Sequence, residues 1–219
     1  MIKKIEEMGV VKELDIYFNL VKECIAHKNL DNFDEIFYKI YDYIMERLND
    51  KLFPKEVNPI DVKIKENCTN IIWVEPSNII NSKQNIVMDH MLPDAIYYFK
   101  KMIEEKSPRK KIICLKEIFN CINNLGLFNG KKFEGVDDEM PFLNYVFIKS
   151  NPDNILNNCR YIELFLWEKK DKFEGQKLTE LIGLCHLLEN YSYNNLFNIS
   201  ISEYELNCDL VKQGILYWF

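Results

Sequence analysis

The stretch Gly135-Val-Asp-Asp-Glu-Met-Pro-Phe-Leu-Asn-Tyr-Val-Phe-Ile-Lys-Ser-Asn-Pro152 decides the fold of this 219-residue chain. Its three consecutive acids, Asp137 to Glu139, come just before Pro141 and an apolar run. Acids gather at the start of a helix because the unpaired backbone amides there favour negative charge. The stretch predicts a helix with an acidic head at Asp137–Pro141 that reaches about Lys149. Asn151-Pro152 ends it, because the residue before a proline disfavours the helical conformation.

Working outward from this stretch, apolar residues recur at spacings of three and four over most of the chain, which indicates helices. We expect a helix, or a broken pair, near the N-terminus, and short helices and connections over 54–85 with Trp73 as a core anchor. The other expected helices begin with recognisable signals such as Ser107-Pro108 and the capping box Ser200–Glu203. They cover about 33–53, 86–105, 108–122, 153–168, the segment after Gly175, and the segment after Ser200. Gly126 is expected to end the helix over 108–122.

The composition favours an all-α fold. With seven Gly and seven Pro, the chain offers few tight turns for β-hairpins. An apolar content of 47% and a chain of this length are enough to bury a sizeable core without disulfides or metals. Seven cysteines occur singly, with no Cys-x-x-Cys pair, which is typical of reduced thiols that fill the core.

Charge and hydropathy exclude several partner classes. The balance of 28 Lys and Arg against 34 Asp and Glu gives a net charge of -6, which argues against non-specific nucleic-acid binding. No apolar stretch approaches the roughly 20 residues of a membrane span, and the N-terminus lacks the apolar core of a secretory signal. We therefore expect a cytoplasmic protein without direct membrane insertion.

The side chains that could carry covalent or metal chemistry form no complete set. Cys24 and His27 lie three residues apart, as do His186 and Glu189, and His90 stands alone. A zinc site needs about four ligands, and neither pair has a second pair beside it in the sequence. Phosphate-binding glycine motifs and a nucleophile elbow are also absent. The sequence predicts neither a metal nor a cofactor.

The stretch Gly135–Pro152 resembles the signature of the vacuolar-protein-sorting-nine (VPS-nine) domain family. In that signature an Asp stands four residues before a Pro, and an apolar helix ends in Lys-x-Asn-Pro. Asn157–Ile162 is similar to the family's Asn-x-x-Tyr-Ile stretch, and Gly175–Leu181 to its Gly-Tyr-x-x-Thr-x-Leu element. Upstream, the resemblance extends to three further segments, so that it covers about residues 35 to 205 in order. These segments are Tyr43–Phe53, Ile72–Pro76 and Pro108–Cys114.

The resemblance implies a guanine nucleotide exchange factor for a Rab-five-type small GTPase, in its GDP-bound or nucleotide-free form. It also implies a helical bundle, here over 1–85, packed as one unit against a helical VPS-nine-type core over 86–219. In such proteins the Asp four residues before the Pro is an acidic finger inserted into the nucleotide site of the GTPase, and here that position is Asp137. The resemblance further implies a monomer that is recruited peripherally to endosomal membranes in vesicle trafficking.

The GTPase-binding residues implied by the resemblance follow the same motifs. Pro141 matches the family's Pro, and Thr179 matches its Thr. Asp138 and Tyr145 complete the expected contact surface on the first motif. Gln176 stands where the family has Tyr, so the aromatic contact is missing: exchange is weaker, the GTPase differs, or a neighbour compensates.

Two alternatives stay open on the sequence. The first is a non-catalytic helical adaptor that binds a small GTPase without releasing nucleotide, which Gln176 favours. The second is a metal- or thiol-dependent enzyme that uses Cys24, His27 or His186.

Overall fold

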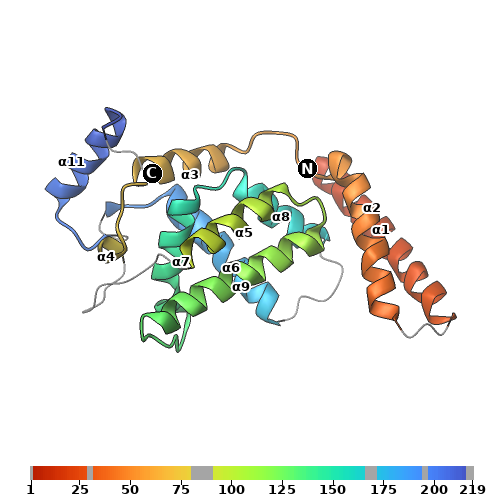
Figure 1. Cartoon of the computed structure of the whole chain (residues 1–219). Helices are drawn as coiled ribbons and strands as arrows, with labels where there is room; N and C mark the ends of the chain where they lie inside the picture. Colours follow the sequence, from red (N-terminus) through yellow and green to blue (C-terminus); the bar gives the residue numbers. More distant parts are fainter. Residues whose placement is uncertain (1, 29–31, 80–90, 166–171, 194–196, 216–219) are drawn as a thin grey trace.

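The computed structural model describes residues 2–28, 32–79, 91–165, 172–193 and 197–215, and these residues form helices and connections with no strand among them (Figure 1). The predicted all-α fold is confirmed. The helices run in the order α1 (Ile2–Ala26), α2 (Phe33–Leu52), α3 (Pro59–Asn70), α4 (Pro76–Ile79), α5 (Leu92–Glu104), α6 (Pro108–Phe128), α7 (Val136–Ser150), α8 (Ile155–Phe165), α9 (Lys172–Glu189) and α11 (Ile201–Lys212).

The first two helices form a hairpin at one end of the molecule (Figure 1). Their contact is a small apolar cluster that also takes in Tyr161 and Phe165 from α8. Because α8 contributes to this cluster, the hairpin is packed onto the rest of the protein. The buried members from the hairpin are Phe18, Ile25, Phe37, Tyr41 and Met45.

A polar contact fixes the hairpin to α6. The carboxylate of Asp42 in α2 is buried. It accepts a hydrogen bond of 2.6 Å from the Ser107 hydroxyl and forms an ion pair with Arg109. The predicted helix start at Ser107-Pro108 is confirmed, but the Ser107 side chain makes no capping bond. Its hydroxyl is used by Asp42 instead.

The larger core lies among α3 to α11 and includes Trp73, as predicted. Helices α5 and α6 lie side by side through its centre, and α7 packs on both (Figure 1). Phe99 of α5 and Phe147 of α7 meet edge to face with ring centroids 5.6 Å apart, and both are fully buried. Ile64 and Cys68 of α3 belong to this core. The boundary at residue 85 between an N-terminal bundle and a VPS-nine-type core stays a prediction.

Several helix ends differ from those predicted. Helix α6 continues past Gly126 to Phe128. Helix α7 begins at Val136, so Pro141 lies inside it rather than at its head. Proline has no N–H, and the bond that residue 141 would give to the Asp137 carbonyl is therefore missing. Gly175 lies in the first turn of α9 and does not precede it. Of the helices predicted over 86–105 and 153–168, residues 86–90 and 166–168 lie outside the described residues.

The helix break at Asn151-Pro152 is confirmed. Helix α7 ends at Ser150, and Asn151 follows in the left-handed conformation with φ 40°. Asparagine tolerates this conformation better than most residues, which suits it to the end of a helix. The same end of α7 holds Lys149, which is buried and donates a hydrogen bond of 2.7 Å to the carbonyl of Ile72.

Lys149 gives the fold a dependence on pH. Burial lowers the pKa of Lys149 to about 8, whereas an unfolded lysine titrates near ~10.4. The unfolded chain therefore binds more protons between these values, so the free energy of unfolding rises with pH over that range, by about 1 to 3 kcal/mol from this group. Urea unfolding at pH 8 and pH 10 measures the rise. Lys149→Met should lose part of it, and an identical pH slope in the variant would refute the assignment.

Candidate functional site

The acidic head of α7 is built by a short loop from α6. Gly135 is the residue before the helix, and Asp137, Asp138 and Glu139 all lie in the first turn, as the sequence predicted. The amide groups of that turn and the helix dipole stabilise the three carboxylates. The structure gives each of these acids different surroundings, which the sequence did not distinguish.

Asp137 points its carboxylate to solvent. The side chain is exposed, and no hydrogen bond or ion pair joins it to another of the described residues. The first turn of the helix fixes the backbone of Asp137, and its exposed carboxylate is accessible to a partner molecule. Asp137 is the acid in this turn that a partner can reach without breaking a contact within the chain.

Asp138 holds the loop that leads into α7. Its carboxylate accepts a hydrogen bond of 3.2 Å from the backbone N–H of Glu134 and lies 3.4 Å from the ammonium of Lys131. Both partners belong to the loop between α6 and α7. Asp138 is half-buried, so it remains partly accessible while it orders the loop.

Glu139 turns inward and reaches α9. It forms a buried ion pair with Lys177, whose ammonium also lies 2.9 Å from Glu180. Burial raises the pKa of Glu139, although the hydrogen bond from Lys177 opposes this. For Lys177, burial lowers the pKa, but the hydrogen bonds to Glu139 and Glu180 outweigh it and leave the pKa raised. Lys177 is therefore firmly charged.

The predicted contact residues on α9 share its solvent face. Thr179 and Gln176 are both exposed. The Thr179 hydroxyl donates a hydrogen bond of 2.8 Å to the carbonyl of Gly175, and the Gln176 amide donates one of 2.8 Å to Glu180. Phe173 is three residues before Gln176, so it lies near the same face, and it is 41% exposed.

The structure brings these two groups of residues together through Glu139 and Lys177. On α7, Pro141 is half-buried behind Asp137, but Tyr145 is only 2% exposed and belongs to the core. Tyr145 therefore supports α7 from inside and is not placed to touch a partner. Sequence reasoning missed Glu139 and Lys177 as a linked pair, since the two are 38 positions apart. The sequence around Glu139 does not indicate Lys177 as its partner, and the sequence around Lys177 does not indicate Glu139.

The loop before α7 depends on Gly126. A Cβ at this position would lie 2.5 Å from the Phe133 ring and 2.9 Å from the Lys131 carbonyl. Phe133 in turn packs on Phe142 of α7, with ring centroids 5.1 Å apart. The absent side chain of Gly126 thus makes room for the aromatic residue that seats the loop on α7.

Gly126→Ala should therefore lower the free energy of unfolding by about 1 to 3 kcal/mol, because the loop must shift. Gly183 offers a matched control, since it lies in α9 with nothing within 4 Å of its built Cβ. Gly183→Ala should raise the free energy of unfolding by about 0.5 to 1 kcal/mol through helix propensity alone. Urea denaturation of both variants measures the difference, and equal shifts would refute the close packing at Gly126.

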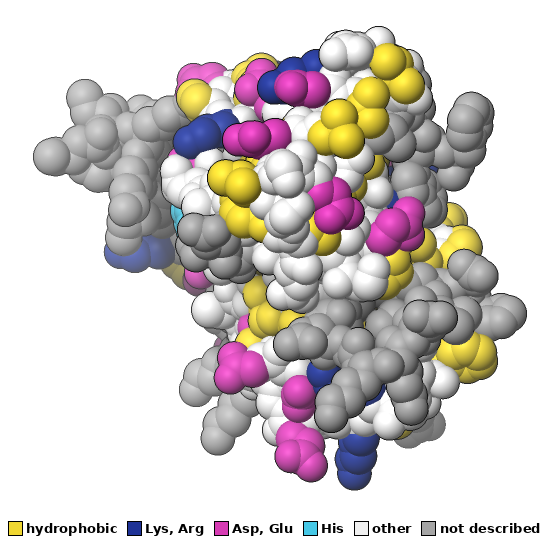
Figure 2. All heavy atoms as spheres, turned by 90° about the vertical axis from the view of Figure 1, so that its left-hand side faces the viewer, with side chains coloured by type: hydrophobic (Ala, Val, Ile, Leu, Met, Phe, Trp, Pro, Cys, Tyr) yellow, Lys and Arg dark blue, Asp and Glu magenta, His cyan; other side chains and the backbone are white. Residues whose placement is uncertain are grey.

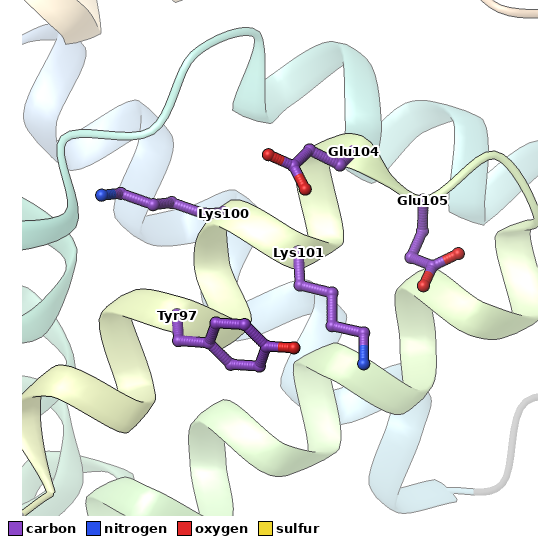
Figure 3. A pocket seen from close by; sticks show the side chains of 5 residues that line it. All are labelled: Tyr97, Lys100, Lys101, Glu104 and Glu105. Carbon is purple, nitrogen blue, oxygen red and sulfur yellow. The ribbon is translucent and has the colours of Figure 1, made fainter.

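Two surface hollows among the described residues hold no catalytic set of side chains. One hollow of about 420 Å³ lies on α5, where the Lys101 ammonium is 5.6 Å from the centre of the Tyr97 ring (Figure 3). Lys100 points away from Lys101, and the two acids Glu104 and Glu105 complete the rim of this hollow. A second hollow of about 410 Å³, between α1 and α2, is almost wholly apolar. Neither contains a converging set of reactive groups.

The candidate metal and thiol residues do not gather into one site, although His186 Nδ1 lies 3.4 Å from Glu189 Oε2. Among the described residues, no three His, Cys, Asp or Glu side chains lie close enough to share a metal ion. Cys24 and His186 are exposed on different helices, and His90 lies outside the described residues. The cysteines are free thiols, and all except Cys24 are buried, as predicted for core residues. In the described part of the chain, no helix has the length and apolar character to cross a bilayer.

The face of the molecule in Figure 2 carries acidic, basic and apolar side chains mixed together. Its coloured side chains form no continuous basic surface, which is what a phosphate backbone would require.

Part of this chain matches a known domain family. Residues 92–193 match the family model of the vacuolar sorting protein 9 (VPS9) domain. The chain is similar to the Rab5 GDP/GTP exchange factor of Homo sapiens, at 28% identity over 163 residues, which cover 69% of this chain and 32% of that protein. It is also similar to vacuolar protein sorting-associated protein 9A of Arabidopsis thaliana, at 35% identity over 115 residues, or 50% of this chain and 22% of that protein.

A third relative is the GTPase-activating protein and VPS9 domain-containing protein 1 of Bos taurus, at 35% identity over 74 residues, or 33% of this chain and 5% of that protein. The chain spans about a third or less of the length of these relatives. The matched segment begins at the first residue of α5 and includes α6 to α9, so the acidic head of α7 and the exposed face of α9 both lie within it. Residues 92–193 of this chain therefore match a VPS9 domain, the VPS-nine domain that the sequence resembles.

Proposed function

We propose that this chain is a guanine nucleotide exchange factor for a Rab5-type small GTPase and that Asp137 is its acidic finger. The observation that carries the proposal is the Asp137 carboxylate, which is exposed on the first turn of α7 and has no hydrogen-bond or ion-pair partner among the described residues. The relatives named as Rab5 GDP/GTP exchange factors support the choice of GTPase.

The chemistry of such a finger is electrostatic. A small GTPase holds GDP through a P-loop lysine and Mg²⁺, which contact the phosphate oxygens. A carboxylate brought close to that lysine satisfies its charge and repels the β-phosphate. At ~4 Å and an effective dielectric constant near 20, two unit charges interact by ~4 kcal/mol. Since each ~1.4 kcal/mol changes a rate tenfold, one carboxylate can supply a large acceleration of GDP release.

Binding of the GTPase requires a second group of residues beside the finger. We assign this role to Pro141 and Asp138 on α7 and to Thr179 and Gln176 on α9. All four are exposed or half-buried, and the two helices that carry them are linked by the Glu139–Lys177 ion pair. We do not assign direct contact to Tyr145, because it is buried.

A non-catalytic adaptor is the second candidate, and the observation that favours it is Gln176. Gln176 offers no aromatic ring, and its amide is already bonded to Glu180. The nearby Phe173 is the neighbour that could replace the missing ring, because it is 41% exposed one turn earlier on α9. If Phe173 takes that role, the adaptor loses its main support.

The experiment that separates these functions is release of fluorescent GDP from a panel of Rab5-type GTPases, with and without the purified chain. Acceleration for at least one GTPase supports the exchange factor. Capture of a GTPase in a pull-down without any acceleration supports the adaptor instead. If no GTPase of the panel is accelerated and none is captured, both the exchange factor and the adaptor are overturned.

The proposal includes a cytoplasmic monomer that is recruited peripherally to endosomal membranes during vesicle trafficking.

A further inference from the structure

A buried group of three charges joins the two helices of the proposed site. Lys177 of α9 pairs with Glu139 of α7, and its ammonium lies 2.9 Å from Glu180. The side chains of Lys177, Glu139 and Glu180 are only 9%, 7% and 8% exposed. Charged side chains are rarely buried to this extent unless they are paired, so their place in this fold calls for a reason.

The position of the pair is what gives it significance for the site. Glu139 follows Asp137 by two residues, and Lys177 lies between Gln176 and Thr179 in the sequence. The Lys177 ammonium also lies 4.5 Å from the centre of the Phe119 ring in α6. A single side chain of α9 thus touches both α6 and the first turn of α7.

Stability alone does not explain such an arrangement. A buried ion pair often contributes no more to stability than apolar residues of similar volume, because both charges lose their hydration. In some coiled coils a buried polar group instead fixes the register between two helices. The Glu139–Lys177 ion pair is placed to do the same for α7, which presents the finger, and α9, which presents the docking face.

We infer that Lys177 is a positioning residue, which holds Asp137 on α7 in a fixed arrangement with the docking residues on α9. This inference rests on the proposed function. Lys177 itself is buried and does not meet the GTPase. When the ion pair is broken, α9 still presents Thr179 and Gln176, but α7 no longer holds the finger in place. The maximal rate of GDP release is therefore more sensitive to Lys177 than the affinity for the GTPase.

The test compares Lys177→Met and Lys177→Arg with a matched control, Lys111→Met. Lys111 is another buried lysine, 1% exposed, which donates hydrogen bonds to the carbonyls of Met102 and Ile103 and to Asn158. It joins α5, α6 and α8 and touches neither α7 nor α9 through these bonds. The rate of GDP release from a Rab5-type GTPase is measured at increasing concentrations of each variant, at a temperature below the melting temperature of that variant. The titration separates the maximal rate of GDP release from the half-saturating concentration.

We expect Lys177→Met to lower the maximal rate by about 10- to 100-fold, with the half-saturating concentration within about threefold of wild type. Lys177→Arg, which keeps the charge, should retain most of the rate. Lys111→Met should lower the melting temperature and leave the rate per folded molecule unchanged. Equal maximal rates for Lys177→Met and Lys111→Met would overturn the inference.

Two further measurements keep the inference testable. If Lys177→Met does not fold, Glu139→Gln breaks the charge pair with little change in shape, and an unchanged maximal rate in that variant would overturn the inference. If wild type accelerates no GTPase, the proposed function has failed, and hydrogen–deuterium exchange then tests the link between the helices. Lys177→Met should increase exchange over residues 136–142, whereas Lys111→Met should not, and equal protection in the two variants counts against Lys177.

Discussion

Asp137→Ala is expected to lower the acceleration of GDP release by about 100- to 1000-fold, because a finger interaction of ~4 kcal/mol at ~4 Å is lost. The variant should fold normally, since the Asp137 side chain is exposed and unbonded among the described residues. Its cost in stability should stay below ~1 kcal/mol, which is the loss of a favourable charge at a helix N-terminus. Circular dichroism and urea denaturation check this, and a stopped-flow GDP-release assay measures the rate.

Asp94 supplies the control for this experiment. It is an exposed acid in the first turn of α5, so Asp94→Ala removes the same carboxylate from a comparable helix start in the same domain. Asp94→Ala should leave GDP release close to wild type. Equal losses in the two variants would mean that net charge, and not the position of Asp137, controls the rate.

Asp61→Ala is expected to lower the free energy of unfolding by about 2 to 6 kcal/mol, because it leaves two buried donors unsatisfied. The Asp61 carboxylate is 4% exposed and accepts hydrogen bonds of 2.7 Å from the N–H of Leu156 and 3.2 Å from the N–H of Asn157. These amides begin α8, so a side chain of α3 completes the first turn of another helix.

Asp61→Asn is the matched variant, because an asparagine keeps one acceptor oxygen. It should lose about half as much stability as Asp61→Ala, measured by urea denaturation of both. The rate of GDP release per folded molecule should not change in either variant, since these hydrogen bonds of Asp61 join it to α8 and to none of the proposed finger and docking residues. A stability close to wild type in Asp61→Ala would contradict the role given to these two hydrogen bonds.

The helices of this protein are largely predictable from local sequence, whereas its polar contacts are not. The spacing of apolar residues located α2, the acids before Pro141 located the start of α7, and Asn151-Pro152 located its end. The prediction that Gly126 ends the helix over 108–122 is wrong, because this glycine lies within α6 and makes room for Phe133. That requirement comes from tertiary packing, which local propensity does not contain.

The candidate site shows the same division. The sequence placed Asp137, Asp138 and Glu139 in one helix turn but gave no way to tell their surroundings apart. Their roles depend on partners elsewhere in the fold, which are Lys131 for Asp138 and Lys177 for Glu139. Only the resemblance to the VPS-nine family singled out Asp137, and the structure adds that its carboxylate is the exposed one with no partner among the described residues.

The measurement that tests the central proposal most directly is the rate of GDP release from a Rab5-type GTPase in the presence of wild-type chain and of Asp137→Ala. The account predicts a rate that rises with the concentration of the wild-type chain and stays close to the intrinsic rate with the variant. A variant that accelerates GDP release as strongly as wild type would contradict the role of Asp137 as the acidic finger.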